Sequence, residues 1–294
     1  MRLYLKLAWR NIFRNKRRTF IAGIAIGIGL AALIYTDALV VGMTRNMIHS
    51  ATASFLGEGQ IHRSGFRQTL EVDQTINKGS EVLAKLDDDP RVADFTPRVT
   101  TFSMISSPAN VQAVSMVGVR PDSEHRLSQI DDALTEGAYF GGDNPRDIVI
   151  GRELAEILEV ELGDRVVLTA AQAHTGDLAQ EMFRISGIFF FNMAEMDKGM
   201  VFVRLHKAQQ MLNLGEDIHE IALKFTNARI ARDSQNPFWD EYSQNGNEAL
   251  GWTVLVPQLE SVLRLSSFST LMLGIILFSV VALGIVNTLF MSLY

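Results

Sequence analysis

The 294-residue sequence has no cysteine, so it can form neither disulfides nor a cysteine-ligated zinc site. It also lacks the GxxxxGK[ST], GxSxG, HExxH and CxxC patterns of nucleotide binding, hydrolysis and metal or redox chemistry. The histidines show no ligand spacing, and the acidic runs at 87–89 and 131–132 lack the glycine and closing glutamate of a calcium loop. We therefore predict that the chain is not an enzyme and has no catalytic, cofactor-binding or metal-binding residues.

No acidic residue occurs before Asp37, whereas seven arginines and lysines fall within the first 18 positions. The segment 42–266 has the opposite balance, with 20 basic and 32 acidic residues. An acidic body of this size argues against nucleic acid as a partner. The basic head needs a separate explanation, which the apolar runs provide.

Two long runs carry no charge, residues 19–36 and residues 265–294. At about 1.5 Å per residue the first covers roughly 27 Å, and it continues beyond Asp37 to Met43. The Leu, Ile, Val and Phe side chains of 271–290 contribute roughly −4 to −8 kcal/mol to membrane insertion. We predict transmembrane helices at 19–41 and 267–294, with Asp37 at the membrane interface.

Lysine and arginine concentrate on the cytoplasmic side of membrane proteins, so residues 1–18 are predicted to face the cytoplasm and 42–266 the exterior. A cleaved signal peptide is the alternative reading of a basic head before an apolar run. This run is longer than a signal sequence, and no A-x-A-like site follows it. Because the chain stops in its second span without a basic flank, we expect it to be a fragment of a longer protein.

The basic head has the periodicity of an amphipathic helix, predicted at 1–18 on the inner membrane surface. Its expected lipid-interface residues are Lys6, Trp9, Arg10, Phe13, Arg14, Arg17 and Arg18. Two alternatives are charge that only sets topology and a nucleic-acid patch at RNKRR, which the adjoining span disfavours.

Both spans are predicted to continue outside the membrane. Apolar residues recur at i+4 up to Phe55, and Pro257 suits the first position of the second helix. This predicts a helical stalk at 42–55 and 258–266, with Met43, Met47, Leu259 and Val262 on its faces. Short connecting helices are the alternative.

Within the membrane, Gly23 and Gly27 form a GxxxG pair for close helix packing, and Asn287 is a candidate for an interhelical hydrogen bond.

The exterior segment is predicted to be a mixed α/β domain. Alternation and β-branched content predict strands at 59–63, 92–119, 147–151, 165–171, 183–191, 200–203, 221–225 and 251–256. Helical patterns cover 79–92, 152–160 and 206–214. Residues 231–242 (ARDSQNPFWDEY) are polar and contain a proline, which predicts a surface segment.

Several segments together resemble the MacB/FtsX-type permease subunits of bacterial ABC transporters, including the lipoprotein-releasing LolC/LolE type. The segments are LAWRNIFRNKRRTFI, VIGRELAEILEVELGDRVVL, FRISGIF, MVFVRLHKAQQML and LGIVNTLFMSLY. The resemblance runs the length of the chain and rests on their order and spacing.

The resemblance implies an α+β membrane protein of the bacterial inner membrane. Two long transmembrane helices would flank a periplasmic domain of MacB-like core type, built from roughly 56–105 and 205–256 with an inserted part between them. It implies a separate ATPase subunit that binds ATP, a homo- or heterodimer of permeases, and a periplasmic lipoprotein or its carrier as a further partner. Lipoprotein release is the function expected first. Efflux driving and FtsX-like mechanotransmission are alternatives, and a two-span sensor or chemoreceptor ectodomain is the rival from another class.

Overall fold

The computed structural model describes residues 16–142 and 144–293. The described chain forms two compact units, one made of the residues up to Ile48 together with those from Gln258 onward, and one made of His49–Pro257. The first unit contains most of helix α2 (Lys16–Ala51) and of helix α12 (Pro257–Leu293). Because α2 begins at Lys16, the last residues of the predicted surface helix belong to the same helix as the first apolar run.

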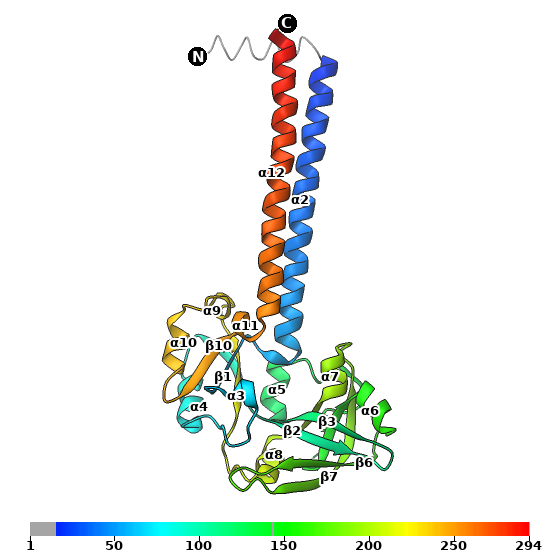
Figure 1. The fold of residues 1–294 in the computed structure, drawn as a ribbon, viewed down its shortest axis with the longest axis vertical. Helices are drawn as coiled ribbons and strands as arrows, with labels where there is room; N and C mark the ends of the chain where they lie inside the picture. The colour runs from blue at the N-terminus through cyan, green and yellow to red at the C-terminus, as the bar shows by residue number, and fades with distance from the viewer. Residues whose placement is uncertain (1–15, 143, 294) are drawn as a thin grey trace. The chain divides into compact units, whose positions relative to one another are not determined.

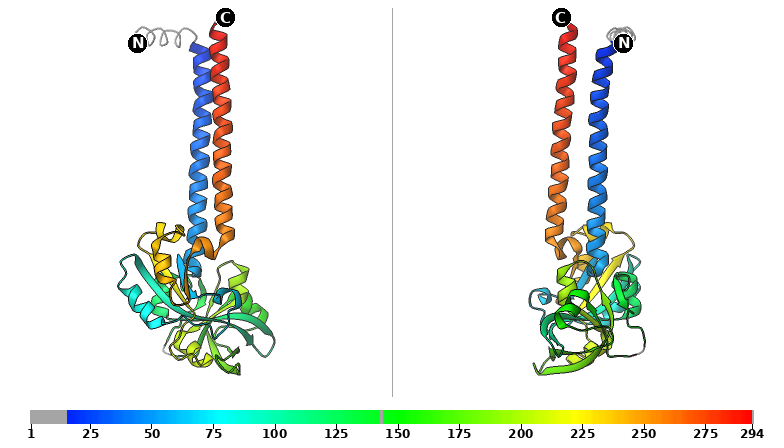
Figure 2. Two further views of the ribbon diagram at one scale, coloured as in Figure 1. Left: turned by 60° about the vertical axis from the view of Figure 1, so that its left-hand side comes forward. Right: turned by 90° about the vertical axis from the view of Figure 1, so that its right-hand side faces the viewer.

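The two long helices run side by side in opposite directions, with the end of α12 beside the start of α2 (Figures 1 and 2). A methyl group placed on Gly29 would lie 3.8 Å from Cγ2 of Val281. Their apolar side chains are exposed on all sides, as expected of helices that face lipid or other membrane helices. Both helices are long and apolar enough to cross a membrane, over Ile26–Leu56 and Pro257–Gly284.

The second unit is a ten-stranded sheet with short helices around it. Its strands are β1 (Gly59–Arg63), β2 (Val92–Ser106), β3 (Val111–Val119), β4 (Leu134–Gly137), β5 (Asp147–Gly151), β6 (Arg165–Ala171), β7 (Leu178–Phe189), β8 (Met200–Arg204), β9 (Glu220–Phe225) and β10 (Asn247–Gly251). Its helices are η1 (Thr52–Leu56), α3 (Phe66–Thr69), α4 (Gly79–Asp87), α5 (Pro121–Leu127), α6 (Arg152–Leu158), α7 (Ala194–Gly199), α8 (Leu205–Leu212), α9 (Arg229–Arg232), α10 (Pro237–Tyr242) and α11 (Trp252–Leu255).

Six strands close into a barrel in the order β2, β3, β8, β5, β7 and β6, because β6 pairs with both β7 and β2. Alternate side chains point inward and are buried. They include Ile105, Met116, Ile148, Leu168, Phe183 and Val203. Strand β2 is the common element: its first half pairs with β9 and its last three residues, Met104–Ser106, pair with β6. Strands β9, β1 and β10 extend the sheet from the first half of β2.

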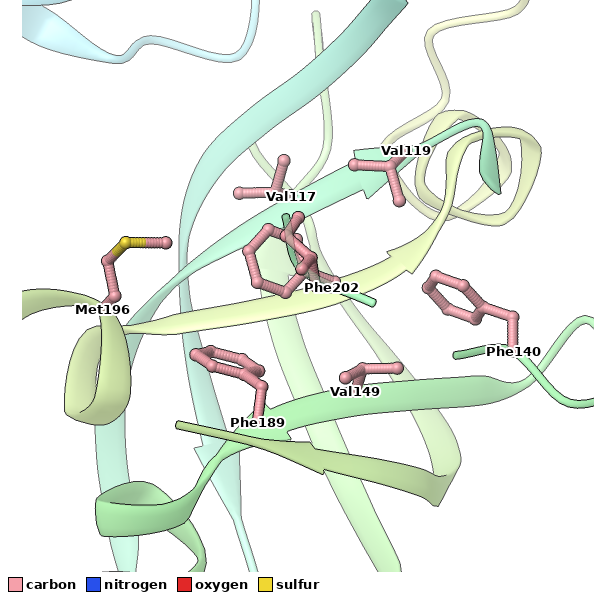
Figure 3. Close-up of a cluster of buried hydrophobic side chains, with 8 residues drawn as sticks. Val117, Val119, Phe140, Val149, Phe189, Met196 and Phe202 are labelled. Atoms are coloured by element: carbon pink, nitrogen blue, oxygen red, sulfur yellow. The ribbon is translucent and has the colours of Figure 1, made fainter. Parts of the chain in front are cut away.

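A second apolar core lies on the outer wall of the barrel. Val117, Val149, Phe189 and Phe202 gather in one cluster with Met196 of α7 (Figure 3). The strand register places Val117, Val149 and Phe202 on the face opposite to that of Met116 and Ile148. Phe55 of η1 packs against this cluster, with its ring centroid 5.5 Å from that of Phe202. The segment that follows α2 is therefore packed on the barrel wall.

Most predicted strands and helices are present in the expected places, but two segments near the end of the exterior domain were predicted wrongly. Residues 251–256 were predicted to be a strand, yet β10 ends at Gly251 and the helix α11 follows. Residues 231–242 were predicted to be a polar surface segment, yet α10 buries Phe238, Trp239 and Tyr242. Short apolar runs do not distinguish a strand from a buried helical turn. The second segment is polar on average, so its average composition did not indicate that its three aromatic side chains share one buried face.

Candidate functional site

The predicted membrane residues are only partly within the described chain. Lys6, Trp9, Arg10, Phe13 and Arg14 lie outside the described residues. Arg17 and Arg18 lie in the first turn of α2, where the Arg17 side chain is exposed. A Cβ atom on Gly23 or Gly27 would have no neighbour within 4 Å, so both glycines are open to another helix. Asn287 lies in α12, and its side chain is not among those that the structure describes.

The predicted stalk residues lie on helices but do not form one packed group. Met43, Met47 and Val262 are exposed, whereas Leu259 is buried. Helix α2 ends at Ala51, and the chain continues directly into η1, a π-helical turn. The contacts with the exterior domain are therefore described at the end of α2 rather than along its sides.

The carbonyl groups at this helix end are bound by the exterior domain. The last carbonyls of a helix lack intrahelical partners and carry the negative end of its dipole. Here the Thr52 carbonyl accepts from Gly57 N at 2.8 Å, and the Ala53 carbonyl accepts from Gln129 N at 2.9 Å. The Phe55 carbonyl accepts from Arg98 Nη2 at 2.6 Å, and the Leu56 carbonyl accepts from Gln60 Nε2 at 3.0 Å. We call this helix end, residues 52–57, the first junction.

The first junction is bound by the side chain of Arg98, which is fully buried. Its Nε and Nη2 donate to the two carboxylate oxygens of Glu124 at 3.0 and 2.6 Å, and its Nη1 donates to Glu220 Oε1 at 2.8 Å. The guanidinium also lies 3.8 Å from the centre of the Phe55 ring. Such a forked, stacked arrangement requires arginine rather than lysine. We call Arg98, Glu124 and Glu220 the buried arginine cluster.

Local folding places the three members of this cluster. Arg98 on β2 is directly opposite Glu220 on β9, so both side chains share one face of the sheet. Glu124 is on α5, which Pro121 begins. Burial raises the pKa of Glu220, while Arg98 opposes that rise. Burial alone would lower the pKa of Arg98, but Glu124 and Glu220 outweigh it and the pKa is raised, so the guanidinium stays charged.

The second junction is where the chain leaves the domain for α12, at residues 252–257. The Glu58 carbonyl accepts from Trp252 N at 3.1 Å, and Arg67 Nη2 donates to the Leu255 carbonyl at 3.0 Å. Gly59 of β1 is paired with Gly251 of β10. The chain therefore enters and leaves the domain on two neighbouring, hydrogen-bonded strands.

His62 lies on β1, the strand next to β9. It is opposite Glu220 on β9 and Glu248 on β10, and its Nδ1 is 3.4 Å from Glu248 Oε1. The side chain is fully buried. Burial, with a smaller contribution from Arg67, lowers the pKa of His62 to about 3. The imidazole is therefore neutral at physiological pH.

An open pocket of about 710 Å³ lies beside α5, lined by Asp122, His125, Asp131, Tyr139 and Arg204 among others. Three of its charged groups have partners: His125 is bound to Asp131, and Arg204 donates to the Phe140 carbonyl at 3.2 Å. Among the described residues, no group of three or more His, Asp or Glu side chains is arranged to hold a metal ion. We therefore take the two junctions, rather than this pocket, as the candidate functional site. Their hydrogen bonds hold the segments that connect the domain to α2 and α12.

Sequence reasoning missed the buried arginine cluster. The available signal was a charge within a predicted strand, Arg98 between the apolar residues Pro97 and Val99. A charge at such a position is buried only when it is paired. The partners could not be found in this way, because Glu124 and Glu220 are distant in sequence and resemble ordinary surface acids.

Comparison with known proteins gives a consistent result. The family model described as MacB-like periplasmic core domain matches residues 19–233. The lipoprotein-releasing system transmembrane protein LolC of Xylella fastidiosa (strain Temecula1) is 23% identical over 97% of this chain and 68% of its own length. LolE of Haemophilus influenzae is 20% identical over 81% of this chain and 58% of its own length.

Two solved structures are also similar. The periplasmic region of MacB from Actinobacillus actinomycetemcomitans is 13% identical, with a TM-score of 0.46 over 69% of this chain and 92% of that one. The extracellular domain of the noncanonic ABC-type transporter YknZ from Gram-positive bacteria is 12% identical, with a TM-score of 0.43 over 65% of this chain and 98% of that one.

Proposed function

Because the chain belongs to the family of MacB-like periplasmic core domains, we propose that it is the permease subunit of a bacterial ABC transporter. In this role it binds no nucleotide itself. A separate cytoplasmic ATPase subunit supplies the energy, and a second permease subunit, identical or different, completes the membrane part.

In the proposed arrangement α2 and α12 cross the inner membrane, with the basic head in the cytoplasm and His49–Pro257 in the periplasm. The positive charge of the head and its absence from both apolar runs support this orientation. Because the chain has no cysteine, single cysteines at Lys16 and at Ala109 can test it directly. A membrane-impermeant maleimide applied to intact spheroplasts should label the Ala109→Cys variant and not the Lys16→Cys variant.

The single observation that carries the proposed function is the double anchoring of the domain. The segment that follows α2 and the segment that precedes α12 are both hydrogen-bonded to the domain's own strands and side chains. A subunit that converts cytoplasmic ATP hydrolysis into periplasmic movement needs such joints, because a loose linker would absorb the displacement.

We propose lipoprotein release as the specific process. The names of the relatives LolC and LolE support it, and so does an exposed apolar face on the outside of the barrel. Phe102 and Met104 on β2, Val111 on β3, and Leu178 and Met182 on β7 are all exposed. The strand register places them on one face across β3, β2, β6 and β7. Exposed apolar side chains gathered on one face indicate an interaction site, and we propose that the released lipoprotein binds there.

The test is reconstitution of the complete permease with its ATPase subunit in proteoliposomes carrying a lipoprotein. We expect the ATPase to co-purify with the permease and ATP to drive release of the lipoprotein. The double variant Phe102→Ser, Met104→Ser should lower release by about tenfold while ATP hydrolysis is kept. Met193→Ser, which replaces an exposed apolar residue outside the patch, is the control. Purification without any ATPase would contradict the permease assignment, and unchanged release in the double variant would contradict the placement of the cargo.

A further inference from the structure

We propose that Arg98 is the positioning residue that couples the first spanning helix to the exterior domain, and that it acts through Glu124, Glu220 and the π-helical turn η1. The inference rests on the proposed function and names the side chains through which movement passes. It concerns how the subunit transmits displacement rather than what it transports.

The first argument is the position of Arg98 on β2. It is the last residue of β2 that pairs with β9, and it is also paired with Val119 on β3. Beyond it, β2 forms the wall of the barrel. A force applied at Arg98 therefore acts on the strand shared by the barrel and the three-stranded extension.

The second argument is the number of elements that one side chain joins. The guanidinium binds the Phe55 carbonyl of η1, the carboxylate of Glu124 on α5 and the carboxylate of Glu220 on β9. Phe55 is held twice, because its ring also lies under the guanidinium and against Phe202. The residues immediately after α5 return to η1, where Gln129 N donates to the Ala53 carbonyl. No displacement of η1 along its axis can leave α5, β2 and β9 in place without breaking these bonds.

The third argument is the unusual geometry of the helix end. A π-helical turn is rare and tends to occur at functional sites. In this turn Gly57 N donates a hydrogen bond to the Thr52 carbonyl. The Phe55 carbonyl accepts its hydrogen bond from Arg98 instead. Because the guanidinium is fully buried, its hydrogen bond to this carbonyl is stronger than one made in water.

A purely structural arginine would leave the same contacts in a static structure, so the experiment must separate stability from coupling. We choose the triple variant Arg98→Met, Glu124→Gln, Glu220→Gln, which removes the cluster without leaving a buried charge. Removing all three charges together avoids the unpaired buried charge that a single substitution would leave. Its thermal melting, followed by tryptophan fluorescence, should therefore remain cooperative and close to that of the unsubstituted protein.

The chain offers a matched control. Arg91 binds Asp89 and Glu241 and lies 5.0 Å from the centre of the Phe238 ring, so it forms a similar cluster in the same domain. Its acidic partners and its stacked ring all lie outside the first junction. The triple variant Arg91→Met, Asp89→Asn, Glu241→Gln therefore removes an ion cluster with the same charges, which is partly exposed rather than fully buried, and leaves the joint intact.

The readout uses the complete permease with its ATPase, labelled by an environment-sensitive fluorophore at Ala109→Cys, an exposed position in the turn after β2. In the unsubstituted complex, ATP binding should change the fluorescence. In the cluster variant we expect this change to fall by about fivefold or more, while ATP hydrolysis stays within about twofold. Release of lipoprotein should fall in parallel, and the Arg91 control should behave like the unsubstituted complex.

A cluster variant that keeps both its fluorescence response and its release would overturn the inference. If that variant does not fold, Arg98→Lys decides, because lysine keeps the charge but loses the fork and the stacking; full coupling in Arg98→Lys would equally overturn it. Failure of the proposed function looks different, because the unsubstituted protein would then bind no ATPase or show no response to ATP.

Discussion

The spanning helices and the exterior domain satisfy their polar groups in opposite ways. In the helices, the hydroxyls of Thr36, Ser269 and Ser279 donate to backbone carbonyls four residues earlier. In the domain, buried charged groups pair across strands, as Arg98 does with Glu220. These hydroxyls of the helices therefore find their acceptors within their own helix, as lipid requires, whereas the Arg98–Glu220 pair depends on the tertiary fold. At the first junction, hydrogen bonding within one helix gives way to hydrogen bonding between different elements of the fold.

The largest expected effect comes from breaking the continuity between the two regions. Insertion of Gly-Gly-Pro after Met47 interrupts α2, because proline and glycine disfavour a helix interior by about 3 and 1 kcal/mol. We expect lipoprotein release by the reconstituted complex to fall to background while ATP hydrolysis continues. The same insertion after Gly215, in an exposed turn of the domain, is the control and should leave most release intact. Equal release from both variants would refute a rigid connection.

The comparison becomes quantitative when the same side chain is removed from each region. Phe202 is fully buried in the outer core, whereas Phe278 is exposed on α12. Phe202→Ala should lower the free energy of unfolding by about 3–5 kcal/mol through lost burial and the cavity it leaves. Phe278→Ala should change it by less than about 1 kcal/mol, because the ring faces lipid in either state. Denaturant titrations of the detergent-solubilised subunit measure both, and similar losses would mean that α12 is packed like a protein core.

The difference between the regions also explains what the sequence could predict. The spans follow from uncharged length alone, and strands such as 147–151 follow from a local apolar pattern. The junctions do not, because the bonds of Arg98 to Glu124 and Glu220 and that of Arg67 to Leu255 depend on the tertiary fold. The helix α11 was missed for a related reason: the chain must turn between the end of β10 and Pro257. A short apolar window does not encode that requirement.

Acid should weaken the exterior domain. The pKa of His62 is lowered to about 3 in the fold, from about 6.5 in the unfolded chain. Between these values the unfolded state binds the extra proton, so stability falls as the pH falls. From pH 7 to pH 5 the loss attributable to His62 is about 2 kcal/mol.

Melting curves of the subunit against pH should show this loss, and His62→Phe should remove it while the remaining carboxylate titrations persist. If the pH dependence of His62→Phe matched that of the unsubstituted protein, His62 would not be the group responsible.

The smallest effects should come from single polar groups, and here too the regions differ. Asn236 accepts from Phe238 N at 3.0 Å at the start of α10, where that amide has no intrahelical acceptor. Asn236→Ala should therefore cost about 1 kcal/mol. Ser279 donates at 2.8 Å to the carbonyl of Ile275, which the helix backbone already satisfies, so Ser279→Ala should cost less than about 0.5 kcal/mol. Paired denaturant titrations resolve this difference, and a larger loss in Ser279→Ala would show that its hydroxyl bonds to another helix in the assembled transporter.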